Sequence, residues 1–208
     1  LYYCRSANQT FRFSSEIRGL SALGAPVSVN PQRLHSYFAS RYTRGWQAVY
    51  EGVESLPPGH LAIISERGDV TIKQYWCPLR NRRPYPGPLA LNDLLRDSVH
   101  RRLKSARPVG ILLSGGMDST LIARLADGGP LDKSLRAFTS SVGGKQFNSE
   151  DERAAGLFAQ THEIPITFVP AGEEKFAEAL KAIEEPLGDT ILSPLYELIR
   201  TSSKEVKV

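Results

Sequence analysis

The residues best suited to chemistry lie in one short segment, residues 109–122, where an apolar run leads into Ser-Gly-Gly-Met-Asp-Ser. Gly115 and Gly116 allow the backbone to turn sharply, with N–H groups pointing inward and no Cβ in the way. Ser114 and Ser119 add hydroxyl groups, and a helix expected to begin near Ser119 directs its positive end to the same point. These groups predict an anion site, and polyphosphate is its natural occupant.

This loop differs from two common nucleotide-binding motifs. It is not a Walker loop, because no Gly-Lys-Ser/Thr follows, and it is not the dinucleotide fingerprint, because the third glycine is missing. Asp118 lies inside the loop, where its carboxylate would repel phosphate unless a divalent cation bridged the two. The sequence therefore predicts Mg²⁺ with Asp118 as its ligand. The alternative is a tight strand-to-helix turn capped by Asp118, with no ligand.

The elements that must position this loop alternate between strands and helices. Strands are expected at residues 108–113, 135–141 and 164–169, and helices at residues 119–127, 150–161, 173–183 and 195–203. Alternation of this kind is typical of crossover units on a parallel sheet. Ser149 and Glu152 form a capping box at the start of the middle helix. An earlier helix is expected from apolar residues spaced by three and four, namely Leu91, Leu94, Leu95, Val99 and Leu103.

The first 80 residues follow an α+β pattern instead. Hairpins are expected within residues 1–14 and 60–75, and two short helices between them. Ser15 is the expected cap of the first helix, and Asn30 followed by proline opens the second. Its expected buried face consists of Leu34, Tyr37, Phe38 and Tyr42. Residues 76–88 hold four prolines, one glycine and three arginines, a linker composition that predicts domains at 1–80 and 89–208.

Composition sets the broad class of protein. With 41% hydrophobic residues and a net charge of +4, wholesale disorder is excluded. No apolar run approaches the roughly 20 residues of a membrane-spanning helix, and the chain start lacks the features of a secretory signal. Two cysteines make no disulfide framework, so a cytoplasmic location is expected. The region from Arg80 to Arg107 has eight basic and two acidic residues and borders the loop, so it would attract a nucleotide phosphate, although a solvated helix face explains each residue equally well.

Two observations predict that the sequence is a fragment. The only methionine is Met117, so no initiator stands at the start. The end, Val206-Lys207-Val208, has the composition of the first residues of a strand.

The Ser-Gly-Gly-Met-Asp-Ser segment resembles the pyrophosphate-binding loop (PP-loop) of ATP pyrophosphatases that adenylate a substrate. The flanking sequence resembles glutamine-dependent asparagine synthetases, in order and over nearly the whole chain. The resembling segments are Leu1-Tyr2-Tyr3, residues 13–20, residues 56–60, Tyr75-Trp76, residues 184–189 and Pro194-Leu195-Tyr196. The resemblance implies a Rossmann-like parallel sheet with helices, preceded by an α+β remnant of an N-terminal-nucleophile glutaminase domain.

The same resemblance implies an amide ligase. The carboxylate of aspartate would attack the α-phosphate of ATP, pyrophosphate would leave, and ammonia from glutamine would attack the acyl-adenylate. Carried over by position, pyrophosphate and Mg²⁺ would be held by Ser114, Gly115, Gly116, Asp118 and Ser119. Leu112 and Ser140 match positions that contact adenosine, and Ser140 replaces the usual apolar residue. The implied partners are small molecules, namely ATP, glutamine or ammonia, and aspartate or another carboxylate; neither a membrane nor nucleic acid is expected, and a homodimer stays open.

Parts of the family pattern are missing. The glutaminase nucleophile is a cysteine at the mature N-terminus, which Leu1 is not, and Cys4 is expected to be a packing residue. A second Ser-Gly loop with acidic ligands would follow Val208. No catalytic residue is therefore assigned, and the chain alone is expected to be inactive. The alternatives are an amide- or lactam-forming relative with another carboxylate substrate, an RNA-modifying PP-loop enzyme, and a non-catalytic binding homologue.

Several other polar residues receive no functional role from the sequence. The four histidines have no metal-site spacing, and the acidic run at 150–152 suits the first turn of a helix. Glu185 and Asp189 match a family segment near the synthetase site, but their partners are missing.

Overall fold

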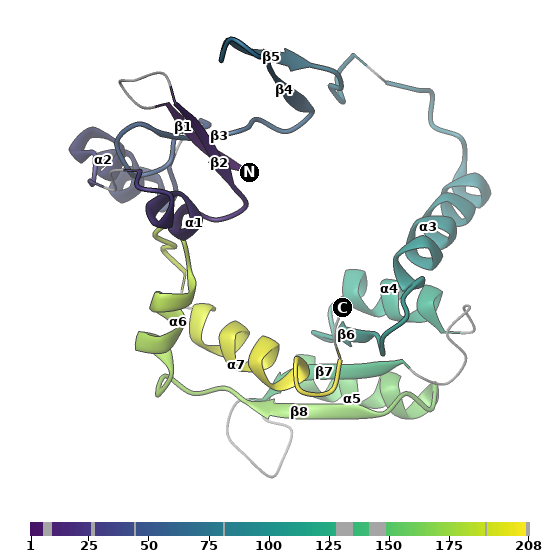
Figure 1. The fold of residues 1–208 in the computed structure, drawn as a ribbon. Helices are drawn as coiled ribbons and strands as arrows, with labels where there is room; N and C mark the ends of the chain where they lie inside the picture. Colours follow the sequence, from purple (N-terminus) through teal and green to yellow (C-terminus); the bar gives the residue numbers. More distant parts are fainter. Residues whose placement is uncertain are drawn as a thin grey trace. The chain divides into compact units, whose positions relative to one another are not determined.

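A computed structural model describes residues 1–5, 10–25, 28–43, 45–80, 82–127, 135–141, 149–189 and 191–206. Contacts divide the chain into two compact units (Figure 1). Unit 1 comprises Leu1–Pro84 and Lys181–Asp189, and unit 2 comprises Tyr85–Leu180 and Thr190–Val208. Among the described residues, no helix has the length and apolar character needed to cross a membrane.

Unit 1 is built on a small antiparallel sheet with the strand order β2-β1-β3. The strands are β1 (Tyr2–Arg5), β2 (Phe11–Ser14) and β3 (Val53–Ser55). The predicted hairpin of the first two strands is confirmed by the pairing of Tyr3 with Phe13, while its turn lies outside the described residues. Sequence patterns missed β3, because its three residues are too few to show alternation.

Helix α1 (Ile17–Ala22) covers one face of this sheet. Leu20, fully buried, packs in one cluster with Cys4 and Val53, so the expected packing role of Cys4 is confirmed. The predicted cap at Ser15 is wrong, because the helix is preceded by Glu16 with no side-chain cap.

Helix α2 (Pro31–Ser40) begins as predicted, with the side chain of Asn30 accepting a hydrogen bond from the Arg33 N–H at 3.1 Å. Its predicted buried face is wrong, since Phe38 is 73% exposed and Tyr42 60% exposed. Periodicity identifies an apolar stripe, but the described residues do not cover it. The second predicted hairpin is confirmed as β4 (His60–Ile64) and β5 (Val70–Gln74).

Unit 2 contains a parallel sheet with the order β6-β7-β8, which confirms the predicted α/β class. Its strands are β6 (Gly110–Leu112), β7 (Arg136–Ser141) and β8 (Ile166–Pro170). Its helices are α3 (Pro88–Leu103), α4 (Met117–Ala126), α5 (Glu150–Thr161), α6 (Phe176–Ala182) and α7 (Leu192–Ser202). The predicted cap of α5 is confirmed, since Ser149 Oγ accepts a hydrogen bond from the Glu152 N–H at 3.1 Å.

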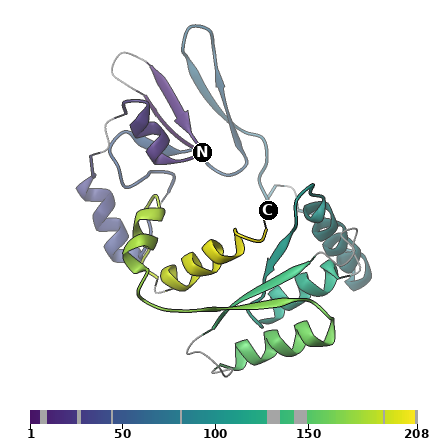
Figure 2. The ribbon, with the colours of Figure 1, turned by 60° about the horizontal axis from the view of Figure 1, so that its bottom comes forward.

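Helices cover both faces of this sheet, because neighbouring residues of β7 point in opposite directions. Ala137 packs with residues of α4 and α5, whereas Phe138 packs with Leu198 of α7. Figure 2 shows α5 and α7 on opposite sides of the sheet. The carboxyl ends of β6 and β7 therefore lie between two helical layers.

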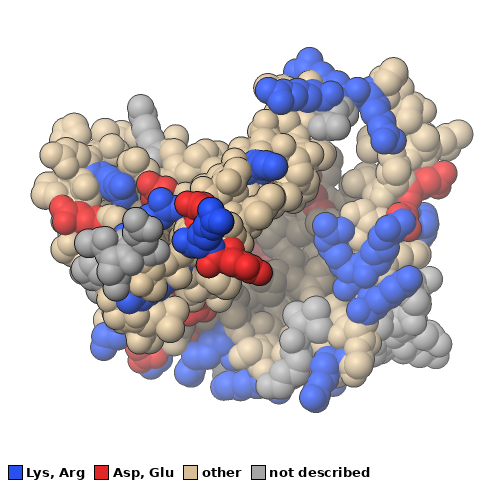
Figure 3. All heavy atoms as spheres, turned by 45° about the horizontal axis from the view of Figure 1, so that its top comes forward, with Lys and Arg blue, Asp and Glu red and all other residues tan. Residues whose placement is uncertain are grey.

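Helix α3 packs against α4 only through its carboxyl-terminal part. Leu103 is buried with Val109 and Ala126, whereas Leu91, Leu94 and Leu95 are exposed, so the predicted buried face extends over only one end of the helix. Lys and Arg side chains gather on the side of Figure 3 where α3 lies. The exposed basic residues of α3 and the following turn are Arg96, Arg101, Arg102, Lys104 and Arg107.

Candidate functional site

The loop between β6 and α4 (residues 113–116, the β6–α4 loop) is fixed by one glycine. Gly115 has φ 83°, in the left-handed region that side chains rarely adopt. A Cβ at this position would also overlap the main-chain carbonyl of Asp151, in the first turn of α5. The loop is thus packed directly against the start of another helix, and only glycine satisfies both constraints.

Hydrogen bonds within the loop involve both predicted serines. Ser114 Oγ lies 2.9 Å from Ser119 Oγ and accepts a hydrogen bond from the Gly116 N–H at 3.3 Å. Ser119 Oγ in turn donates to the Gly116 carbonyl at 3.1 Å. The hydroxyl groups therefore hold the shape of the loop, and the Gly116 amide already has a partner. A ligand would have to compete with these weak local contacts.

The first turn of α4 presents unpaired amide groups. The helix begins at Met117, two residues earlier than predicted, and no side chain caps it. Within the described part of the chain, the N–H groups of Gly115, Met117 and Asp118 have no acceptor. Unpaired amides at the positive end of a helix form an anion site.

The carboxylate of Asp118 is exposed in this first turn and has no hydrogen-bond partner or ion pair among the described residues. A carboxylate is favoured there by the helix dipole even without a ligand. The described residues contain no group of three or more His, Cys, Asp or Glu side chains that could hold a metal ion. Mg²⁺, however, is often bound by only one or two carboxylates together with the phosphates of a substrate, and an exposed, unpaired Asp118 fits that mode.

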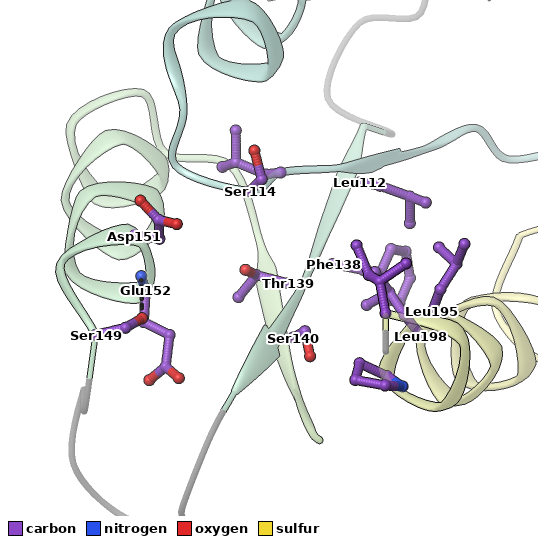
Figure 4. Close-up of a pocket in the computed structure, with 13 residues that line it drawn as sticks. Leu112, Ser114, Phe138, Thr139, Ser140, Ser149, Asp151, Glu152, Leu195 and Leu198 are labelled. Atoms are coloured by element: carbon purple, nitrogen blue, oxygen red, sulfur yellow. Dashed lines mark hydrogen bonds between the residues drawn. The ribbon is translucent and has the colours of Figure 1, made fainter. Parts of the chain in front are cut away.

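A pocket of about 440 Å³ opens beside the loop, at the carboxyl ends of β6 and β7. Figure 4 shows its apolar wall, formed by Leu112, Phe138, Leu195 and Leu198, opposite the first turn of α5. Its polar lining consists of Ser114, Thr139, Ser140, Ser149, Asp151 and Glu152. Ligands of open parallel sheets bind at this edge, beyond the carboxyl ends of the strands.

The structure brings the predicted site residues into one region of unit 2. Leu112, Ser114 and Ser140 line the pocket. The remaining four, Gly115, Gly116, Asp118 and Ser119, do not line it but lie in the adjoining loop and the first turn of α4.

Sequence reasoning missed two groups of lining residues. Asp151 and Glu152 were attributed to the helix dipole alone, yet both line the pocket, and Glu152 is only 2% exposed. The acidic run itself was visible in the sequence, but only the contact of Gly115 with α5 in the structure shows that these carboxylates lie beside the loop. The α7 residues, including Leu195 and Leu198, gave no local signal, since they follow the loop by about 80 residues.

Three of the four histidines have a polar contact with the main chain or a carboxylate. His60 Nδ1 lies 2.8 Å from the Pro58 carbonyl, and His100 Nε2 lies 3.1 Å from the Leu125 carbonyl. His162 Nδ1 lies 3.0 Å from Asp127 Oδ2.

In unit 1, burial raises the pKa of the Cys4 thiol. A thiol in that state is a poor nucleophile, because the thiolate is the reactive form. Neither Cys4 nor Cys77 forms a disulfide.

Comparison with known proteins finds two family matches, one in each part of the sequence. The family model described as "Asparagine synthase" matches residues 90–208, and that described as "Glutamine amidotransferase domain" matches residues 1–76. The first match covers more than half of the chain.

Curated relatives are similar over most or all of the chain. Asparagine synthetase [glutamine-hydrolyzing] 1 of Bacillus subtilis is 28% identical over 100% of this chain and 33% of its own length. A putative asparagine synthetase of Methanocaldococcus jannaschii is 26% identical over 100% of this chain and 42% of its own length. The chain therefore spans about a third of the length of the Bacillus relative.

Solved structures give a weaker match. A glutamine-dependent NAD⁺ synthetase from Acinetobacter baumannii is 16% identical, covers 91% of this chain and 44% of its own, and has a TM-score of 0.42. An NH3-dependent NAD synthetase from Campylobacter jejuni is 18% identical, covers 56% of this chain and 52% of its own, and has a TM-score of 0.39. The family assignment rests on the sequence matches, and by these the chain belongs to the asparagine synthase family.

Proposed function

We propose that unit 2 binds ATP for an amide ligase that adenylates a carboxylate and releases pyrophosphate. The observation that carries this proposal is the adjacency of two features in unit 2. One is an apolar pocket at the sheet edge, and the other is a loop and helix start where the amides of Gly115, Met117 and Asp118 have no acceptor among the described residues. The apolar wall suits a base, and the loop suits the phosphates. Aspartate is the proposed carboxylate, because the relatives are named asparagine synthetases and asparagine is the amide of aspartate.

The proposed chemistry has two steps. First, a carboxylate oxygen of the substrate attacks the α-phosphorus of ATP, and the bond to the β-phosphate oxygen breaks, giving an acyl-adenylate and pyrophosphate. Then ammonia attacks the acyl carbon, AMP leaves with the electron pair of the broken bond, and the amide loses a proton. Ammonia would come from glutamine hydrolysis in the amidotransferase part of the polypeptide, to which residues 1–76 belong by similarity.

The contribution of this chain to the first step is electrostatic. Negative charge grows on the departing pyrophosphate, and the fixed amides of Gly115, Met117 and Asp118 would donate hydrogen bonds to it. Because Gly115 is locked against α5, these donors need little reorganisation during the reaction. Asp118 would hold Mg²⁺, which supplies charge neutralisation to the phosphates when bound.

Binding is the property to test in the 208-residue chain itself. We expect ATP with Mg²⁺ to bind one site in equilibrium dialysis, and pyrophosphate to compete with it. Asp118→Ala should weaken binding, whereas Asp93→Ala, an exposed carboxylate on α3, should not. Binding of ATP that pyrophosphate does not displace would contradict the proposed role of the loop.

Catalysis should be tested in a longer polypeptide that contains these 208 residues and matches the full length of a relative such as the Bacillus protein. We expect aspartate-dependent exchange of labelled pyrophosphate into ATP, lost in Asp118→Ala, while glutamine hydrolysis is retained. If exchange requires another carboxylate, that carboxylate and not aspartate is the substrate. If exchange requires tRNA, the amide-ligase proposal is overturned. Equal loss of both activities in the variant would argue against separate sites.

A further inference from the structure

A second pocket of about 440 Å³ is present in unit 2, lined by residues of α3, α4 and β6, and we call it the α3–α4 pocket. The two helices pack side by side (Figure 1). Successive residues of a strand point to opposite faces, so Ile111 lines this pocket whereas Leu112 lines the pocket proposed for ATP. The two pockets share no lining residue. The α3–α4 pocket therefore has no role in the chemistry proposed above.

The lining of the α3–α4 pocket is mostly apolar. Leu103, Val109 and Ala126 are buried and pack in one cluster. Leu95 and Ile122 also line the pocket but remain exposed, so a concave apolar surface faces water. Covering such a surface is favourable, and the volume falls within the roughly 300–1,000 Å³ that is typical of small-molecule sites. The pocket thus suits the apolar part of one small molecule.

Polar side chains line the α3–α4 pocket at one place. Among its described lining residues, only Ser98 and Arg102 have polar side chains, and both belong to α3. Arg102 Nη1 donates to the Ser98 carbonyl at 3.0 Å and to Ser98 Oγ at 2.7 Å, which holds the guanidinium against the helix. Its other nitrogens, Nε and Nη2, have no acceptor in the part of the chain that the structure describes. Two donors on the edge of a planar guanidinium match the two oxygens of a carboxylate.

The charges around the α3–α4 pocket favour an anion. No Asp or Glu is among the described residues that line it. Asp97 of α3 is paired with Arg101 at 2.8 Å. The same helix and the turn after it carry further exposed basic residues, namely Arg96, Lys104 and Arg107. A field of this sign attracts a ligand with a negative charge and repels one with a positive charge.

We propose that the α3–α4 pocket binds a small amphiphile with one anionic head group, of the class of medium-chain carboxylates. The carbon chain lies on Val99, Leu103 and Ile111, and the head group accepts hydrogen bonds from Arg102. The apolar lining supplies most of the affinity, and the guanidinium selects the charge of the head group. Because the site is separate from the pocket proposed for ATP, the inference does not depend on the proposed function.

Calorimetric titration of the 208-residue chain with decanoate, below its micelle concentration, tests the chemistry of the ligand. Decanoate should bind more tightly than decanol, and decanol more tightly than decyltrimethylammonium. Arg102→Gln should weaken decanoate binding by about threefold, as expected for an exposed ion pair, and should leave decanol binding unchanged. Arg101→Gln is the matched control, because it removes the same charge from the next residue, which does not line the pocket. Equal affinities for decanoate and decyltrimethylammonium, or no binding of decanoate, would overturn the proposal.

Methyl NMR of the wild type locates the site without relying on a variant that folds. Decanoate should shift the signals of Ile111 and Ile122, which line the α3–α4 pocket, and not that of Ile191, which lines the other pocket. Ile122→Trp should abolish detectable decanoate binding by filling the pocket, whereas Leu121→Trp, at an exposed α4 residue outside the lining, should not.

Competition with ATP separates this proposal from the proposed function. Saturating ATP with Mg²⁺ should leave decanoate affinity within twofold of its value without ATP. Displacement of decanoate by ATP, or a shift confined to Ile191, would assign the ligand to the other pocket and overturn the inference. Binding of decanoate at Ile111 and Ile122 by a chain that does not bind ATP would overturn the proposed function alone.

Discussion

The β6–α4 loop with the first turn of α4 and the 181–189 segment both place carboxylates beside backbone, but they differ in what those carboxylates contact. Glu184 and Glu185 are paired with Arg18 and Thr43. Asp118 is exposed and has no partner among the described residues, and the amides next to it are equally unpaired. A paired carboxylate holds structure together, whereas an unpaired one next to free donors is available to a ligand.

Gly115→Ala should have the largest effect on this comparison. The left-handed backbone and the overlap with the Asp151 carbonyl should together cost about 2 kcal/mol or more of the free energy of unfolding. ATP binding should be lost with it, because the loop amides would move. Urea unfolding and equilibrium dialysis provide the two measurements.

Gly116→Ala is the control for that change. Gly116 has φ −71°, and the nearest atom to an added Cβ is Ser114 Oγ at 3.4 Å. Its stability loss should stay below about 1 kcal/mol. Equal losses in the two variants would show that the contact with α5 does not fix the loop.

The effect of Asp118→Ala on ATP binding should depend on Mg²⁺. With Mg²⁺ present we expect roughly a tenfold loss of affinity, equivalent to about 1.4 kcal/mol. With the metal removed by a chelator, the variant should bind ATP as well as the wild type or better, because a repulsive charge is gone. An affinity loss of the same size without Mg²⁺ would rule out a metal-ligand role.

Glu184→Gln should differ from Asp118→Ala, because it should lower the stability of unit 1 and should not affect ATP binding through Mg²⁺. Losing its charge weakens the pairing with Arg18, which should cost about 1 kcal/mol of stability, since Arg18 is 61% and Glu184 17% exposed. ATP affinity should be unchanged with or without the metal, because the contacts of Glu184 lie within unit 1. A decrease confined to Mg²⁺-containing buffer would place Glu184 in the metal site and contradict its role in unit 1.

Tyr3→Phe tests a further paired carboxylate of unit 1 and should have the smallest effect, about 0.5 kcal/mol at pH 7. Tyr3 Oη donates to Glu54 Oε2 at 2.7 Å. Burial, with this hydrogen bond and the Glu54 charge, raises the pKa of Tyr3 from 10.0 to about 12.

The sign of the pH dependence follows from that direction. The folded state favours the neutral hydroxyl, so its contribution to stability is complete below pH 10 and is lost as pH rises toward 12. Wild-type unfolding free energy should therefore fall more steeply than that of the variant between these values. Parallel curves would show that Tyr3 ionises as it does in the unfolded chain.

The parts of the fold that follow from local patterns were predictable. Alternating strands and helices gave the parallel sheet, and Asn30 and Ser149 marked two helix starts correctly. Periodicity failed on α2 and on the first half of α3, because an apolar stripe does not say what covers it. The contact of Arg18 with Glu184 joins residues 166 positions apart, a distance at which no sequence pattern acts.

The candidate site likewise contains residues that local patterns reveal and residues that only tertiary packing brings to the site. The glycines and serines of the β6–α4 loop were visible because local backbone geometry restricts them to a few residue types. Asp151 was dismissed, because an acidic first turn has a sufficient explanation without a ligand. The wall from α7 could not be predicted, since it depends on where a later helix packs on Phe138.

The contact between Gly115 and the Asp151 carbonyl limits how this protein could be redesigned. A variant with altered preference for the proposed nucleotide base would have to be sought among the α7 side chains that line the pocket, such as Leu195. A side chain at Gly115 would instead require the start of α5 to move. Directed evolution of the protein should therefore accumulate substitutions on one side of the pocket and almost none on the other.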